Sequence, residues 1–151
     1  MKYRRQKWLV ALPFLIGLFI PLGIATASAG YYGGSERTIG PADGYSYTNV
    51  AYLETTVPDE YAWTETLPLY AGTEIPGNYL GVQASLFESG GALCVQSSVD
   101  WDSSPNYGLF TNSPVGDYCG SGQYYGKGWS HIYNGTGYDV YGTYDTAGYS
   151  I

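Results

Sequence analysis

QYYGKGWSHIY-NGTG-YDVYGTY, residues 123–144, is the stretch that decides the fold. Its Asn134-Gly135 pair supplies the positive φ angles that tight hairpin turns need. We therefore expect two antiparallel strands, one on each side of this turn. Trp129, His131 and Tyr133 share one face of the first strand, because successive side chains of a strand point to opposite sides. We expect this face to be buried and Trp129 to lie in the core.

A second hairpin is predicted just upstream. Leu80, Val82, Ala84 and Leu86 alternate with small or polar residues over residues 79–87, as the inward face of a half-buried strand does. The turn signal Glu88-Ser89-Gly90-Gly91 follows, and residues 93–99 return with a similar alternation.

The rest of the chain after residue 30 predicts further strands and no helix, since glycine or proline interrupts nearly every window. Residues 45–56 and 61–70 are strand candidates. Residues 30–44 are rich in glycine without alternation and predict a flexible arm, and residues 100–117 predict a long loop. The fold class is therefore expected to be all-β, a small antiparallel sandwich or barrel-like domain over residues 45–151.

The first 29 residues have the pattern of a secretory signal peptide. Four basic residues within MKYRRQK precede the apolar run 8–24, and Ala27-Ser28-Ala29 fits the small-x-small cleavage site. We predict a signal helix that is removed after Ala29, and hence a secreted, extracellular protein. The alternative is an uncleaved membrane anchor, because the apolar run approaches the length of a spanning helix.

Charge limits the partners of the mature chain. Residues 30–151 keep only Arg37 and Lys127 with all 13 acidic residues, so the net charge changes from −7 to −11. This composition disfavours nucleic acid, which needs a basic surface, and anionic lipids or wall polymers. A neutral polymer or a protein at the cell surface is the expected partner, and cations and basic proteins remain open. After signal cleavage we expect no membrane association.

Cys94 and Cys119 are the two cysteines, and both follow the predicted signal. An exported chain meets an oxidising environment, so we predict that they form a disulfide. The alternative is a pair of buried free thiols.

No catalytic or metal-binding motif stands out. His131 is the single histidine, and the neighbouring Ser130 would point to the other face of its strand, which disfavours a serine-type triad. Zinc would lack ligands, and a calcium loop at residues 100–104 lacks the spaced ladder of an EF-hand. The candidates for a glycosidase pair are four carboxylates: Glu54, Glu65, Asp100 and Asp102. No two of them are singled out, so we predict a protein that is not an enzyme and carries no metal or cofactor.

The aromatic content is the most unusual feature, with 18 tyrosines and four tryptophans in 151 residues. Such rings give rigid amphipathic area that suits binding surfaces. Trp101, Trp63 and Tyr107 are the candidate binding aromatics, with Trp101 preferred because it lies in the predicted loop that the Cys94–Cys119 disulfide would tether. The alternative is that the rings build the core of a domain poor in leucine.

The segments IPGNYLGVQASLF (75–87), LC (93–94), GQYYGKG (122–128) and YNGTGY (133–138) resemble a pattern of small secreted proteins of Gram-positive bacteria. The resemblance covers about the C-terminal half of the chain. It implies an extracellular location and a β fold.

These observations together favour a secreted, non-catalytic module that binds a polymer or protein at the cell surface. A structural or assembly protein of the cell exterior and a bacteriocin-like secreted toxin are the alternatives, and a hydrolase ranks below them.

Overall fold

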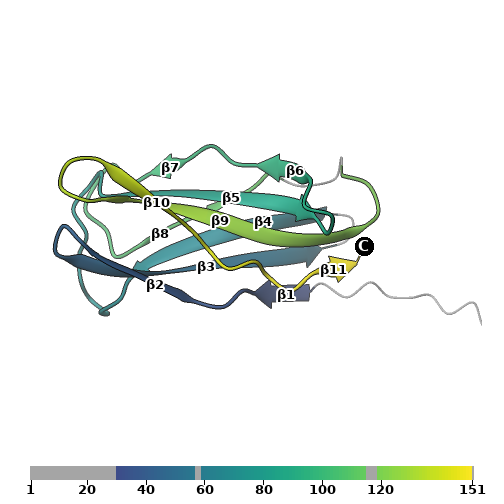
Figure 1. Ribbon diagram of the computed structural model, residues 1–151, viewed down its shortest axis with the longest axis horizontal. Helices are drawn as coiled ribbons and strands as arrows, with labels where there is room; N and C mark the ends of the chain where they lie inside the picture. The colour runs from purple at the N-terminus through teal and green to yellow at the C-terminus, as the bar shows by residue number, and fades with distance from the viewer. Residues whose placement is uncertain (1–29, 57–58, 115–118, 151) are drawn as a thin grey trace, which may run out of the picture.

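The computed structural model describes residues 30–56, 59–114 and 119–150. Within these ranges the chain forms two antiparallel β-sheets that pack face to face, which confirms the all-β sandwich, and neither sheet closes into a barrel. The strands run along the long axis of the molecule (Figure 1). The described part contains no helix suited to crossing a membrane. The predicted signal peptide lies outside the described residues.

The first sheet is built on the long hairpin of β3 (Tyr45–Thr56) and β4 (Asp59–Pro68). β8 (Leu109–Asn112) pairs with the free side of β4. Along the free side of β3, β1 (Gly30–Gly33) and β2 (Arg37–Ala42) lie end to end. One edge of this sheet is therefore a strand interrupted near its middle.

The second sheet is also built on a central pair, β5 and β9, but it has two short strands end to end on each side. Its strands are β5 (Leu80–Glu88), β9 (Gln123–Tyr133), β10 (Tyr138–Gly142) and β11 (Tyr149–Ser150) beside β9, and β6 (Leu93–Gln96) and β7 (Asp100–Trp101) beside β5. Every edge strand of the two sheets has only two to six residues. Short edge strands limit pairing with the edge of another chain.

Both predicted hairpins are confirmed. β5 pairs with β6, and β9 pairs with β10. In the second turn, the Oδ1 atom of Asn134 accepts hydrogen bonds from the backbone N–H groups of Thr136 (3.1 Å) and Gly137 (3.0 Å). Gly135 has a φ of 94°, the left-handed conformation that glycine adopts without strain.

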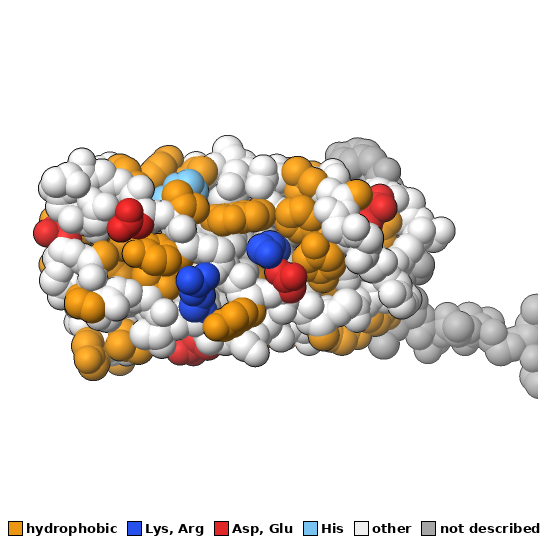
Figure 2. Space-filling model, viewed as in Figure 1, with side chains coloured by type: hydrophobic (Ala, Val, Ile, Leu, Met, Phe, Trp, Pro, Cys, Tyr) orange, Lys and Arg blue, Asp and Glu red, His pale blue; other side chains and the backbone are white. Residues whose placement is uncertain are grey.

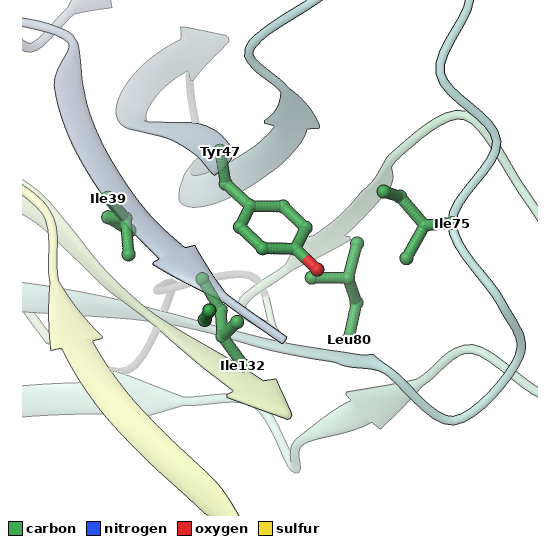
Figure 3. Packing of buried hydrophobic residues seen from close by; sticks show 6 residues of the cluster. Ile39, Tyr47, Ile75, Leu80 and Ile132 are labelled. Atoms are coloured by element: carbon green, nitrogen blue, oxygen red, sulfur yellow. The ribbon is translucent and has the colours of Figure 1, made fainter. Parts of the chain in front are cut away.

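The core between the sheets has two apolar clusters. The larger consists of Ile39, Ala42, Tyr47, Ile75, Leu80 and Ile132. Figure 3 shows the Tyr47 ring among the aliphatic side chains of this cluster. The smaller cluster consists of Leu53, Ala62, Leu86 and Tyr124. The predicted inward face of β5 is confirmed, because Leu80 and Leu86 are fully buried.

A polar layer lies between the sheets in addition to these clusters. The Nδ2 atom of Asn49 donates to the Oγ atom of Ser130 at 2.9 Å, and that hydroxyl also bonds the hydroxyl of Thr66 at 2.7 Å. These three buried residues join β3, β4 and β9. Hydrogen bonding offsets the cost of burying such groups.

The predicted orientation of β9 is wrong. Its inward residues are Tyr124, Gly126, Gly128, Ser130 and Ile132. Trp129, expected in the core, points outward with His131 and Tyr133, and all three are only half-buried. The two sheets approach each other closely along the middle of β9, and the space between them there admits only glycine and serine. The large aromatic side chains therefore pack on the outer face.

Two segments that were predicted to be irregular contain short strands. Residues 30–44, expected to be a flexible arm, contain β1 and β2, which complete the edge of β3. Within the predicted loop 100–117, β7 pairs with β5, and β8 pairs with β4. These strands are short and gain their hydrogen bonds from distant partners, so local alternation gives little sign of them.

The predicted disulfide between Cys94 and Cys119 is present, with the two Cα atoms 5.8 Å apart. It joins β6 to the segment that leads into β9, and both cysteines pack against the smaller apolar cluster. The predicted loop is thus tethered at this end of the sandwich.

Candidate functional site

The outer face of the first sheet carries an acidic and aromatic surface. Along β3 the side chains of Ala51 and Leu53 point inward and are fully buried, which places Tyr52 and Glu54 on the outer face. Along β4 the inward residues are Ala62 and Thr64. The outward residues of β4 are Tyr61, Trp63 and Glu65.

Trp63 lies at the centre of this surface. Its ring stacks on Tyr52 of β3, with centroids 3.9 Å apart and an angle of 14° between the planes. Tyr31 of β1 lies 5.8 Å from Trp63, and Phe110 of β8 meets it edge-on at 6.5 Å. Four strands therefore contribute one ring each to a continuous aromatic group.

A shallow pocket of about 260 Å³ opens beside Trp63. We call it the Trp63 pocket; it is lined by Glu54, Tyr61, Trp63, Glu65, Phe110 and Asn112. Tyr52 covers one face of the Trp63 ring, and the pocket lies on the side of Phe110 and Asn112 from β8. Its volume is just below the range of about 300–1,000 Å³ that holds drug-sized ligands, so a single small ring suits it.

Glu54 and Glu65 interact with tyrosines of the same surface. A hydrogen bond to Glu54, with burial adding to it, raises the pKa of Tyr61 to about 12. Burial is the main cause that raises the pKa of Tyr52, followed by the charge of Glu65. Burial, Tyr52 and the charge of Glu65 together raise the pKa of Tyr31 to about 12. These shifts have one sign because burial and a nearby carboxylate both disfavour the charged tyrosinate.

A second hollow of about 430 Å³ lies farther along the same two strands. Thr48 of β3 and Leu67 of β4 line it, together with Glu36 and Tyr107. Thr48 and Leu67 are paired across the strands and share the outer face with Tyr52 and Trp63. Two of the three candidate binding aromatics, Trp63 and Tyr107, thus lie in hollows along one sheet.

Trp101, the third candidate, lies on the second sheet. It is 43% exposed. A Cβ added to Gly81 would come within 2.7 Å of its ring, so the indole lies directly over the β5 backbone. His131 and Tyr138 flank it, with ring centroids at 5.5 and 4.7 Å. Figure 2 shows this histidine, in pale blue, among hydrophobic side chains.

The other residues considered for catalysis or metal binding are His131, Ser130 and Asp102, and each is held among residues of the fold. Burial lowers the pKa of His131, which favours the neutral imidazole. Ser130 points to the opposite side of β9 and bonds Asn49 and Thr66. Buried Asp102 accepts hydrogen bonds from the Leu80 backbone N–H at 3.1 Å and from Asn106 at 2.9 Å.

Asp100 is part of β7. Of the four candidate carboxylates, the structure brings Glu54 and Glu65 together in one pocket and leaves the two aspartates elsewhere. Among the residues that the structure describes, no three His, Cys, Asp or Glu side chains gather in a way that could hold a metal ion.

No family model matches the chain, and neither does a curated protein or a solved structure. The Trp63 pocket is therefore interpreted from its own residues.

Sequence reasoning missed the residues that close the pocket on one side. Phe110 and Asn112 belong to β8, within the segment expected to be a loop. Tyr31, which lies beside Trp63 and outside the pocket lining, belongs to β1, within the expected arm. Residues 109–112 read Leu-Phe-Thr-Asn, which has no apolar–polar alternation, so no local signal marks this strand.

Proposed function

We propose that this protein is an exported, extracellular module that binds a polysaccharide in the Trp63 pocket and does not change it chemically. The observation that carries the proposal is the Trp63 ring, held by Tyr52 at 3.9 Å, with a pocket beside it and a carboxylate at each end. The C–H faces of a sugar ring stack on an indole, and carboxylates and amides bind its hydroxyl groups.

Three further observations support an extracellular binding role. The sequence of residues 1–29 predicts export, and the Cys94–Cys119 disulfide is consistent with an oxidising compartment. The second hollow on the same outer face extends the surface beyond one sugar ring. The short edge strands give less support to the alternative of an assembly protein, which would need free edges for pairing.

Calorimetric titration with soluble polysaccharides, namely a β-glucan, a xylan and a glucosamine polymer, tests the proposal. We expect Trp63→Ala to weaken binding to the recognised polymer by at least about tenfold, the loss typical of a central aromatic residue. Trp101→Ala is the matched control, because it removes an indole from the other sheet. The proposal is wrong if folded Trp63→Ala binds like the wild type, or if only Trp101→Ala loses binding.

A hydrolase is the second candidate, because Glu54 and Glu65 line one pocket. Glu54 pairs with Tyr61, four residues before Glu65 on β4, so the two backbone positions lie about 13 Å apart along the strands at about 3.3 Å per residue. The paired catalytic carboxyl groups of glycosidases are separated by about 5 to 9.5 Å. The larger backbone spacing of Glu54 and Glu65 therefore gives less support to a hydrolase than to a binding module. Release of reducing ends from the bound polymer, abolished in both Glu54→Gln and Glu65→Gln, would favour the hydrolase over the binding module.

A further inference from the structure

The lining of the Trp63 pocket combines aromatic faces with negative charge. Trp63, Tyr61 and Phe110 supply the rings, and Glu54 and Glu65 supply the carboxylates. An aromatic face attracts a cation through its quadrupole, and a nearby carboxylate adds a direct charge interaction. The pocket thus has the chemistry of a site for an organic cation.

The basic residues of the described chain do not neutralise this pocket. Lys127 of β9 forms an ion pair with Asp145 at 3.0 Å. Arg37 donates to the backbone oxygen of Gly142 at 2.7 Å and lies over the Tyr141 ring. Figure 2 shows both basic side chains, in blue, on one face of the molecule. Among the described residues, none that lines the Trp63 pocket is basic, so a positively charged ligand would meet no repelling side chain there.

Tyr31, beside Trp63, lies in the field of the same two carboxylates. Burial is the main cause that raises the pKa of Tyr31, and the charges of Glu65 and Glu54 add to it. A cation placed against Trp63 would experience both carboxylates.

We propose that the sugar unit bound in the Trp63 pocket carries a protonated amine, so that the ligand is an amino-sugar polysaccharide with free amino groups. This inference rests on the proposed polysaccharide-binding function and names its substrate class. The sugar ring packs on the free side of Trp63, and its ammonium group faces Glu54 or Glu65.

The outer face beyond the pocket favours a polymer over a small cation. The second hollow contains another carboxylate, Glu36, and another ring, Tyr107. It follows the pocket along β4, with Leu67 four residues beyond Trp63 on the same face. A chain with an amine on each unit would meet an acidic group in each hollow.

Two matched ligands test the inference: a glucosamine hexamer and an N-acetylglucosamine hexamer, which differ only in the charge and acetylation of the amine. Titration is carried out with the whole mature protein at a pH where the free amine is protonated. We expect the glucosamine hexamer to bind at least about tenfold more tightly, and its affinity to fall with added salt.

Three variants locate the effect. The double variant Glu54→Gln, Glu65→Gln should lose the preference for the free amine, and the single variants show which carboxylate faces it. Asp139→Asn is the matched control, since it removes one charge from an exposed position on β10 and should keep the preference.

The outcomes separate this inference from the proposed function. Equal or tighter binding of the acetylated hexamer, lost in Trp63→Ala, overturns the amine inference and leaves the binding module standing. Failure of Trp63→Ala to affect any polysaccharide contradicts the binding function itself. Tighter binding of a lysine hexapeptide than of the glucosamine hexamer also overturns the inference, because the cation would then be recognised without the sugar.

Discussion

Gly128 of β9 faces Thr64 of β4 across the sandwich so closely that a Cβ at residue 128 would lie 1.8 Å from the Thr64 Oγ1 atom. Thr64 is fully buried and Gly128 is buried. Gly126 is similarly close to β3, with the Tyr52 carbonyl oxygen 2.7 Å from its added Cβ position. The backbone of β9 therefore packs directly on the sheet that carries the Trp63 pocket on its other side.

Gly128→Ala should lower the free energy of unfolding by about 3 kcal/mol, because the added methyl group forces the sheets or Thr64 to move. Urea unfolding followed by tryptophan fluorescence measures the change. Gly137→Ala is the control: nothing lies within 4 Å of its added Cβ, so a change below about 0.5 kcal/mol is expected. Adding Thr64→Ala to Gly128→Ala should recover part of the loss, and no recovery would contradict the assigned contact.

This close approach explains which parts of the fold could be predicted. The bounds of β3 and β9 follow from alternation and turn residues, because these signals are local. The buried side of β9 depends instead on the distance between the sheets. Its inward residues include Gly126 and Gly128, and its outward ones include Trp129, so a rule that puts large apolar residues inside selects the wrong face.

The disulfide closes a segment with a sequence separation of 25 residues, between Cys94 and Cys119. Cys94→Ser combined with Cys119→Ser should destabilise the protein by about 3 kcal/mol, since the unfolded chain regains the entropy of the open loop. The midpoint of urea unfolding measures this effect. Reduction of the wild type with a thiol should give a similar shift, and an unchanged midpoint in both cases would show that the bond does not stabilise the fold.

Tyr61 should titrate at a higher pH than an ordinary tyrosine. Its folded-state pKa of about 12 exceeds the ordinary value of 10.0, mainly because of the hydrogen bond to Glu54. A raised folded-state pKa gives stability that is present below pH 10 and is lost as the pH rises toward 12. The contribution of Tyr61 to the tyrosinate absorbance is identified by its loss in Tyr61→Phe. Glu54→Gln should therefore move this contribution to lower pH. Asp139→Asn should leave it unchanged, and a Tyr61 pKa insensitive to Glu54→Gln would contradict the hydrogen bond.

The candidate site was predictable to the extent that its chemistry resides in single residues. Trp63, Tyr107, Glu54 and Glu65 were all identifiable by type. The grouping of Trp63, Glu54 and Glu65 was not, because it depends on the register between β3 and β4 and on Phe110 from β8. Trp101 has the expected exposure but belongs to the other sheet, since the position of β7 is determined by pairing with β5.

The start of β1 leads to a prediction about processing. The backbone nitrogen of Gly30 donates to the Oγ1 atom of Thr55 at 3.0 Å, and cleavage after Ala29 would turn this nitrogen into the amino terminus. An ammonium group keeps a donor for Thr55, so the first pair of β1 and β3 can persist after cleavage. This contact is compatible with the cleavage site that Ala27-Ser28-Ala29 predicts, so N-terminal sequencing of the exported protein should begin at Gly30.

Variants of the cleavage site separate removal of the signal from membrane anchoring. Ala29→Leu should block processing and keep the full-length chain with the membrane fraction, because the peptidase cleft accepts small side chains next to the cleaved bond. Ser28→Leu is the control, since the middle position of the site tolerates other residues. A wild-type chain that stays intact and membrane-bound would contradict cleavage. The net charge of −11 would then no longer apply, because it depends on losing the four basic residues of the signal. The secreted role would also have to be abandoned, because the chain would not be released.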